Sequence, residues 1–262
     1  MKTIRFEQDD GIGRIILCAP PGNMLDKAFC ENLRLAVHEA SESDARVILV
    51  KSEGPHFSFG GEVREWPGKD INWFRTFVNE VNMSYRAIEA LRVPTICAVR
   101  GLAFGGGFEL ALNCDFVVAA EDAVFRCVEV TTGMLPIAGG LQRLAERAGR
   151  VMASRWSMLG EPISGREAGQ WGIVSHVVPA ADVEDTAEAL ARKLSTGPTR
   201  SYHATRTLLK AWSAGGVPAA DVIMLDITME LFNNDDVQRG FVSTAKAFDE
   251  GVEPPEMIFH GR

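Results

Sequence analysis

The chain has 262 residues, of which 46% are hydrophobic and 24% are charged, and its formal net charge is −8 at pH 7. This composition predicts a soluble globular protein with one main domain, and since no apolar run approaches the roughly 18 residues of a membrane span, we expect it to be cytoplasmic. The acidic balance argues against general nucleic-acid binding, because neutralising phosphates requires a basic surface.

Strand and helix patterns alternate from the beginning of the chain. Residues 12–18 (IGRIILC) are typical of a strand, and residues 27–40 place apolar side chains at helical spacing. The segment RVILVKS, which begins at Arg46, is a nearly continuous apolar run of the kind found in strands of covered sheets. These segments predict a unit of strand, loop, helix and second strand.

The same alternation recurs in the middle of the chain. Asp70 is placed to cap a long helix that ends before Pro94. A strand at PTICAV, a short helix from about Gly106, and strands at DFVVAA and AVFRC follow. We therefore predict an α/β core over residues 1–195.

The last part of the chain is mainly helical in pattern. One more strand is predicted at IVSHVV, and the Gly197-Pro198 dipeptide precedes three helical stretches, at about residues 200–212, 219–232 and 237–248. The tail over residues 196–262 carries apolar side chains that a few helices cannot bury alone, among them Met224, Leu225, Met229, Leu231 and Phe232. We expect them to pack on the core or on a neighbouring subunit.

Two glycine-rich loops follow predicted strands. GPHFSFGGEVRE contains Gly60 and Gly61, and RGLAFGGGFELALNCDF contains Gly105, Gly106 and Gly107. Backbone N–H groups from two such loops can hold an oxygen atom that becomes negative during a reaction. The pair of loops therefore predicts an oxyanion hole.

Two glutamates stand close to these loops in the predicted core. Glu109 lies in the first turn of the helix opened by the glycines, where the helix dipole stabilises a carboxylate in any protein. Glu129 follows a strand and has apolar neighbours in FRCVEVTTG. If both side chains face one pocket, one can stay protonated while the other is ionised, as paired acid and base chemistry requires.

Other reactive motifs are absent or incomplete. The glycine order fits neither a dinucleotide fingerprint nor a P-loop. HFSFG lacks the first glycine of a nucleophile elbow, so Ser58 is interpreted as a loop hydroxyl. The five histidines have no metal-ligand spacing and the five cysteines have no C-x-x-C spacing, so we expect no metal site and reduced thiols. Arg143, Arg147 and Arg150 form a basic helical stripe, which is more typical of a solvated or subunit-facing edge than of an anion site.

Three segments, in order, resemble the signature regions of the crotonase superfamily, specifically the enoyl-CoA hydratases and isomerases. They are FSFGGEVRE, GLAFGGGFELALNCDFVVAAEDAVF and VEVTTGMLPIAGGLQRL, and the similarity covers nearly the whole chain. The resemblance implies a spiral of ββα repeats with a helical C-terminal trimerisation region. It also implies a coenzyme A thioester as substrate.

The resemblance assigns roles to particular residues. It implies that the amides of Gly61 and Gly106 bind the thioester oxygen and that Glu109 and Glu129 are the two hydratase carboxyls. The residues implied in CoA binding are Lys27, Phe59, Gly60, Gly61, Arg64, Gly105, Gly106 and Lys246, the last from a neighbouring subunit. Three sites depart from the family pattern, with Phe59 in place of alanine, Ile137 in place of glycine, and 126–128 in place of Gly-x-Pro.

The resemblance favours an enoyl-CoA hydratase of fatty acid metabolism, which adds water across the 2,3 double bond. An enoyl-CoA isomerase is the alternative, since isomerases commonly keep a single one of the two carboxyls, and a non-catalytic crotonase-fold binding protein is a third hypothesis. Coenzyme A belongs to the substrate, and we expect no metal or redox cofactor. We expect a homotrimer or a dimer of trimers, while the acyl group stays open because the segment 66–77, expected to line its pocket, has no recognisable pattern.

Overall fold

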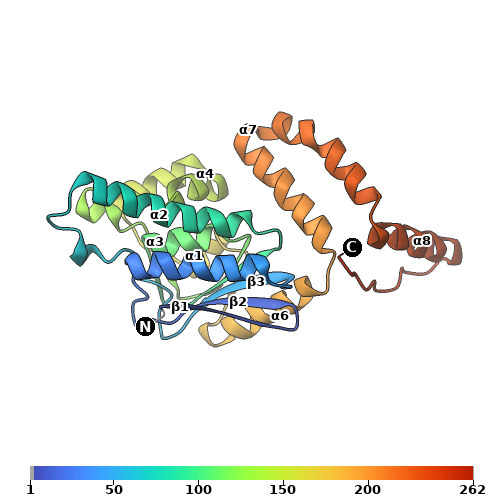
Figure 1. Ribbon diagram of the computed structural model, residues 1–262, viewed down its shortest axis with the longest axis horizontal. Coiled ribbons are helices and arrows are strands. Elements are labelled where there is room, and N and C mark those ends of the chain that lie inside the picture. The colour runs from blue at the N-terminus through green and yellow to red at the C-terminus, as the bar shows by residue number, and fades with distance from the viewer. Residues whose placement is uncertain (1–2, 262) are drawn as a thin grey trace.

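The computed structural model describes residues 3–261. Residues 1 and 2 of the predicted core and residue 262 of the predicted tail lie outside the described residues. Its largest sheet has the strand order β1-β2-β3-β4-β6-β9 (Figure 1). The strands are β1 (Ile4–Asp9), β2 (Ile12–Leu17), β3 (Val47–Ser52), β4 (Thr95–Val99), β6 (Phe116–Ala120) and β9 (His176–Val178). All neighbours are parallel except β1 and β2. The central strands are buried, in keeping with their continuous apolar sequences.

A smaller second layer lies beside this sheet. It contains β5 (Leu102–Phe104), β7 (Val124–Arg126) and β8 (Ile163–Ser164). Two isolated parallel bridges, Leu25 with Gly61 and Ser58 with Ala103, extend the pairing to earlier parts of the chain. Each glycine-rich loop therefore runs through this second layer.

Helices complete each strand pair. They are α1 (Lys27–Glu42), α2 (Ile71–Ala90), α3 (Gly106–Leu112), α4 (Gly140–Leu159), α5 (Gly165–Gln170) and α6 (Val183–Ser195). Four times the chain passes from the large sheet through the second layer into a helix, the helices being α1, α2, α3 and α4 in turn. This arrangement confirms the predicted spiral of ββα repeats.

Local sequence signals explain where the helices begin. Asp70 Oδ1 accepts hydrogen bonds from the amides of Asn72 and Trp73, both at 2.8 Å, as the predicted cap of α2 requires.

Strand β1 was not among the sequence predictions. It is an edge strand with Ile4 as its buried residue, so its polar sequence gives little apolar alternation.

The arginine stripe of α4 has a structural role that neither interpretation of the sequence included. Arg147 is largely buried and donates to the carbonyl oxygens of Ile173 (2.8 Å), Leu112 (3.0 Å) and Cys114 (2.6 Å). Arg143 pairs with Glu89 of α2 at 2.5 Å. These two guanidinium groups therefore join α4 to neighbouring elements of the core.

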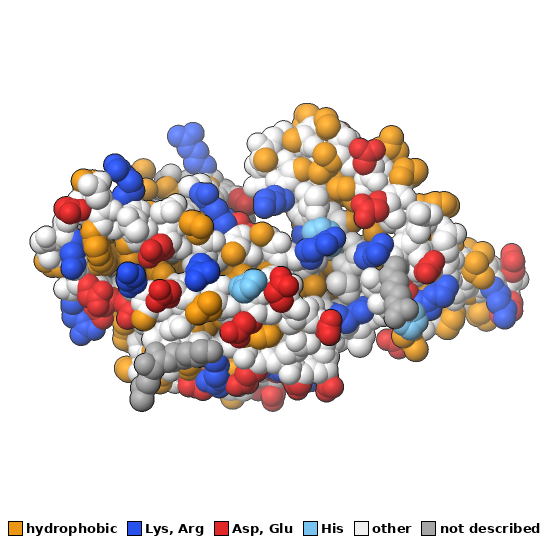
Figure 2. Space-filling view, viewed as in Figure 1, with side chains coloured by type: hydrophobic (Ala, Val, Ile, Leu, Met, Phe, Trp, Pro, Cys, Tyr) orange, Lys and Arg blue, Asp and Glu red, His pale blue; other side chains and the backbone are white. Residues whose placement is uncertain are grey.

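Helices α7 (Thr199–Phe232) and α8 (Asp235–Glu250) form an arm that projects from the core (Figure 1). Arg206 anchors its base by donating to Asp115 (2.9 Å) and to the carbonyl oxygen of Leu91. Hydrophobic side chains gather on the arm in Figure 2. The large exposed ones are Leu209, Trp212, Val217, Val222, Met224, Leu225, Met229, Phe232, Phe241, Val242 and Phe248.

Helix α7 also has the length and mean hydropathy of a membrane-spanning helix. The apolar runs of the sequence had not predicted such a helix. Its backbone is broken at Gly215 and Gly216, where φ is −157° and 69°. Each half is therefore shorter than the roughly 20 residues that a membrane span requires.

Candidate active site

The two glycine loops and the two glutamates meet at one cavity of about 230 Å³. Apolar and aromatic side chains make up most of its wall, including Met24, Leu25, Trp66, Phe77, Val81, Met134, Leu135 and Ile137. Trp66 and Phe77 come from the segment expected to line the acyl pocket. Six predicted site residues also line it, namely Phe59, Gly61, Gly105, Gly106, Glu109 and Glu129.

Ser58 joins the two glycine loops. Its carbonyl oxygen accepts from the amide of Phe104 at 2.9 Å, and its Oγ accepts from the amide of Gly60 at 3.1 Å. The same Oγ donates to the carbonyl oxygen of Asn23 at 2.8 Å. Ser58 is fully buried, so the interpretation of this serine as a loop hydroxyl agrees with its contacts.

Two glycines are required by the geometry of these loops. Gly60 has a φ of 85°, and a Cβ at this position would lie 2.6 Å from the carbonyl oxygen of Phe104. Gly105 has a φ of 48°, and a Cβ there would lie 3.1 Å from Oε1 of Glu129. Side chains at either position would separate the loops or displace the carboxyl.

Gly61 and Gly106 are the residues whose amides were predicted to form an oxyanion hole. Both residues line the cavity, and neither amide donates a hydrogen bond to another group within residues 3–261. Tyr85 Oη donates to the carbonyl oxygen of Gly106 at 2.7 Å and thereby fixes the start of α3. Two residues whose amides have no acceptor among the described residues therefore line one cavity, and the oxyanion hole stays a prediction.

Glu109 is 3% exposed, and its carboxyl is held by the start of a different helix from its own. Its Oε1 accepts from the amides of Ala138 and Gly140, both at 2.8 Å, and Gly140 is the first residue of α4. The sequence interpretation credited the dipole of α3, whereas these direct donors belong to the beginning of α4. Burial, with the nearby charge of Glu129, raises the pKa of Glu109 to about 7 although the two amides oppose the shift.

Glu129 begins a short 3-10 helix (Glu129–Thr132) just after β7. Burial raises the pKa of its carboxyl. Its Oε2 is buried, and so is Oε2 of Glu109, and neither atom has a hydrogen-bond partner among the described residues. Two carboxyls with raised pKa values thus line the same cavity.

The basic residues predicted to bind CoA lie outside this cavity. Lys27 is exposed at the start of α1, and the side chain of Arg64 is 80% exposed and pairs with Glu62. Lys246 lies on α8 and pairs with Glu250 at 3.8 Å. Gly60 packs behind the cavity wall against the other loop. Their contact with CoA stays a prediction.

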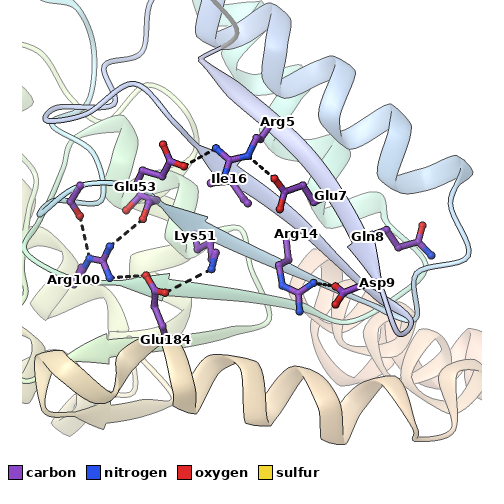
Figure 3. A pocket seen from close by; sticks show the side chains of 12 residues that line it. Arg5, Glu7, Gln8, Asp9, Arg14, Ile16, Lys51, Glu53, Arg100 and Glu184 are labelled. Atoms are coloured by element: carbon purple, nitrogen blue, oxygen red, sulfur yellow. Dashed lines mark hydrogen bonds and ion pairs between the residues drawn. The ribbon is translucent and has the colours of Figure 1, made fainter.

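A larger hollow of about 730 Å³ lies over β1, β2 and β3 and the start of α6 (Figure 3). Its charged side chains pair with one another, as Arg5 does with Glu53 at 2.7 Å and Arg100 with Glu184 at 2.6 Å. Because these charges are already matched and neither Gly61 nor Gly106 lines this hollow, we assign the chemistry to the smaller cavity.

Three supporting residues were missed in the sequence. Ala138 and Gly140 act through backbone amides, which carry no side-chain signal. A Cβ on Gly140 would lie 2.4 Å from Cγ of Glu109, so the glycine pair in LPIAGG was the available clue. Tyr85 lies in the long helix predicted after Asp70, and its hydroxyl contact is visible only in the fold.

Comparison with known proteins agrees with this site. A family model described as enoyl-CoA hydratase/isomerase matches residues 7–254. A probable enoyl-CoA hydratase of Rhodobacter capsulatus is 30% identical over 239 residues, covering 91% of this chain and 93% of that protein. A probable enoyl-CoA hydratase of Bacillus subtilis is 34% identical over 199 residues, covering 74% of this chain and 77% of that protein. The crystal structure of an enoyl-CoA hydratase from Bacillus anthracis has a TM-score of 0.88 at 26% identity, covering 99% of this chain and 100% of that one.

The pKa of Glu109 predicts a pH-dependent stability. This carboxyl binds its proton more tightly in the folded state, with a pKa of about 7 against the ordinary 4.5. The stabilisation of the folded state by this proton is therefore complete below about pH 4.5, and it is lost as the pH rises through 7. The resulting change in unfolding free energy is about 3 kcal/mol. We expect Glu109→Gln to remove this loss, measured by urea unfolding between pH 5 and 8.

The exposed Glu39 of α1 provides the control for this measurement. Glu39→Gln is expected to keep the pH dependence of the parent chain. An equal slope in the parent and in Glu109→Gln would contradict the assigned pKa.

Proposed function

The chain belongs to the enoyl-CoA hydratase/isomerase family, and we propose that it is an enoyl-CoA hydratase, a lyase that adds water across the 2,3 double bond. The observation that carries the proposal is the pair of buried, unpartnered Oε2 atoms of Glu109 and Glu129 in one apolar cavity. Relatives named probable enoyl-CoA hydratases at 30–34% identity support it.

The amides of Gly61 and Gly106 bind the thioester oxygen of the substrate. As the C3–O bond forms, electron density moves through C2 onto this oxygen, and the two donors stabilise the enolate-like state. One such donor contributes about 3 to 4 kcal/mol to the transition state. Because the thioester itself accepts this charge and no net oxidation occurs, the reaction requires no metal or redox cofactor.

The two carboxyls exchange protons with water and substrate. With its pKa raised to about 7, Glu109 can hold a proton near neutral pH, so that one carboxyl of the pair is protonated while the other is ionised. A water molecule between the free oxygens gives a proton to the ionised carboxyl while its oxygen bonds to C3, and the protonated carboxyl gives its proton to C2. The pair ends with the proton count with which it began, and the product is a 3-hydroxyacyl-CoA.

The nucleotide end of CoA carries phosphates and needs basic contacts despite the acidic total charge. Lys27 follows Leu25 closely in the sequence, and Arg64 follows Gly61 closely. Both Leu25 and Gly61 line the cavity. Lys246 lies on the arm, so it would act in a neighbouring subunit of a trimer. Burial of the apolar arm between subunits provides the energetic reason for such an assembly.

The glutamate assignment predicts a large loss of turnover without unfolding. Glu109→Gln and Glu129→Gln each lose a proton-transfer group, so each is expected to lose at least ~100-fold in kcat. Steady-state hydration of a short 2-enoyl-CoA measures this, with Glu121→Gln, a carboxyl outside the cavity, as the control. Hydration near the parent rate by either cavity variant would remove that residue from the mechanism.

Isotope labelling separates hydratase from isomerase. Two carboxyls can hold and activate water, whereas an isomerase moves one proton between C2 and C4. We expect a 2-enoyl-CoA in ¹⁸O-labelled water to give labelled 3-hydroxyacyl-CoA, with Glu109→Ala impaired in incorporation. Ready conversion of a 3-enoyl to a 2-enoyl substrate without any labelled hydroxyl would replace the hydratase by the isomerase.

The arm predicts a trimer or a dimer of trimers. We expect the full-length chain at micromolar concentration to have the mass of a trimer or of a dimer of trimers in sedimentation equilibrium. Leu225→Glu places a charge on the exposed apolar surface and is expected to weaken the assembly. A full-length chain that sediments as a monomer would contradict the proposed assembly.

A further inference from the structure

Two separate hollows meet at Ile137. One is the cavity of the candidate active site, and the other is a groove of about 480 Å³ along the outer side of α2. Besides Ile137, the groove is lined by the apolar side chains of Phe74 and Val78 and by the polar ones of Arg75, Asn79, Asn82 and Arg86. Of the described residues that line either hollow, Ile137 is the one that lines both.

The backbone around Ile137 is fixed on both sides. Asn82 Nδ2 donates to the carbonyl oxygen of Ile137 at 2.7 Å and to that of Val78 at 2.8 Å, which ties this segment to α2. The next residue, Ala138, donates its amide to Oε1 of Glu109 at 2.8 Å. Ile137 is therefore held between α2 and the segment that orients a reacting carboxyl.

This position is where an acyl chain leaves the reacting atoms. With the thioester oxygen on Gly61 and Gly106, C2 and C3 face the glutamates, so C4 and later carbons extend beyond Glu109. The cavity that receives them is about 230 Å³. This volume is below the roughly 300–1,000 Å³ of typical small-molecule sites, which favours a short acyl group.

We propose that Ile137 determines acyl-chain length by closing the far end of the cavity. Its half-buried side chain lies between the cavity and the groove, so the preferred substrates are short 2-enoyl thioesters. With a smaller side chain at this position, the groove beside Phe74 and Val78 receives a longer tail. The inference rests on the proposed function for the identity of the substrate.

A second apolar residue of the cavity wall, Leu135, lies away from the groove. Leu135 is 60% exposed and lines the cavity, while it does not line the groove. Leu135 thus provides a matched control, because trimming it enlarges the cavity without joining it to the groove.

The test compares Ile137→Ala with Leu135→Ala on 2-enoyl-CoA substrates of four to ten carbons. Each newly buried methylene improves kcat/KM about fourfold. We expect the ten-carbon to four-carbon ratio of kcat/KM to rise at least about 50-fold in Ile137→Ala, the equivalent of three methylenes. Ile137→Val, which removes a single methyl group, is expected to give a smaller rise, and Leu135→Ala to leave the ratio unchanged.

Calorimetric binding of the saturated butyryl-CoA and decanoyl-CoA supplies a readout that needs no turnover. Ile137→Ala is expected to bind decanoyl-CoA more tightly relative to butyryl-CoA than the parent chain does, and Ile137→Val is expected to show an intermediate ratio. If no enoyl-CoA is hydrated while this binding ratio still shifts, the proposed reaction fails and the role of Ile137 stands. An unchanged ratio in both isoleucine variants, or a rise in Leu135→Ala instead, overturns the inference.

Discussion

The carboxyl of Glu109 is buried, and the amides of Ala138 and Gly140 are what make this burial possible. A buried carboxylate without donors would cost several kcal/mol, and two amides at a helix start offset part of this cost. They satisfy one oxygen and leave Oε2 without a partner. The incomplete compensation is what raises the pKa of Glu109 toward neutrality and makes the group able to exchange a proton.

This arrangement connects separate repeats of the spiral. The carboxyl comes from α3, its donors come from the start of α4, and Tyr85 of α2 fixes the carbonyl oxygen of Gly106 at the beginning of α3. Ser58 joins the two glycine loops through its carbonyl and its hydroxyl. Successive ββα units therefore bring Gly61, Gly106, the Glu109 carboxyl and the amides that bind this carboxyl to one cavity, and packing of the repeats sets the geometry of the site.

The polar site and the apolar arm place different demands on the chain. In the core, charged groups are matched internally, as Arg147 is by three carbonyl oxygens and Arg143 by Glu89. On α7 and α8, large apolar side chains stay exposed in the single chain (Figure 2). The arm is anchored to the core by Arg206, so a partner that covered its apolar face would be held at a defined place relative to the cavity.

Much of this protein was determined by local sequence patterns. Alternating apolar periodicities predicted the central strands and the main helices, and the glycine loops with Glu109 and Glu129 predicted the contents of the cavity, because these signals are carried by residue type and short-range spacing. The sequence pattern did not predict strand β1, because it is a largely polar edge strand. The tertiary structure decided that the amides of Ala138 and Gly140 orient Glu109, that Arg147 is an internal support, and that Ile137 lies between two hollows. These contacts join residues 26 or more positions apart or use backbone groups that every residue has, so their partners are set by how the repeats pack.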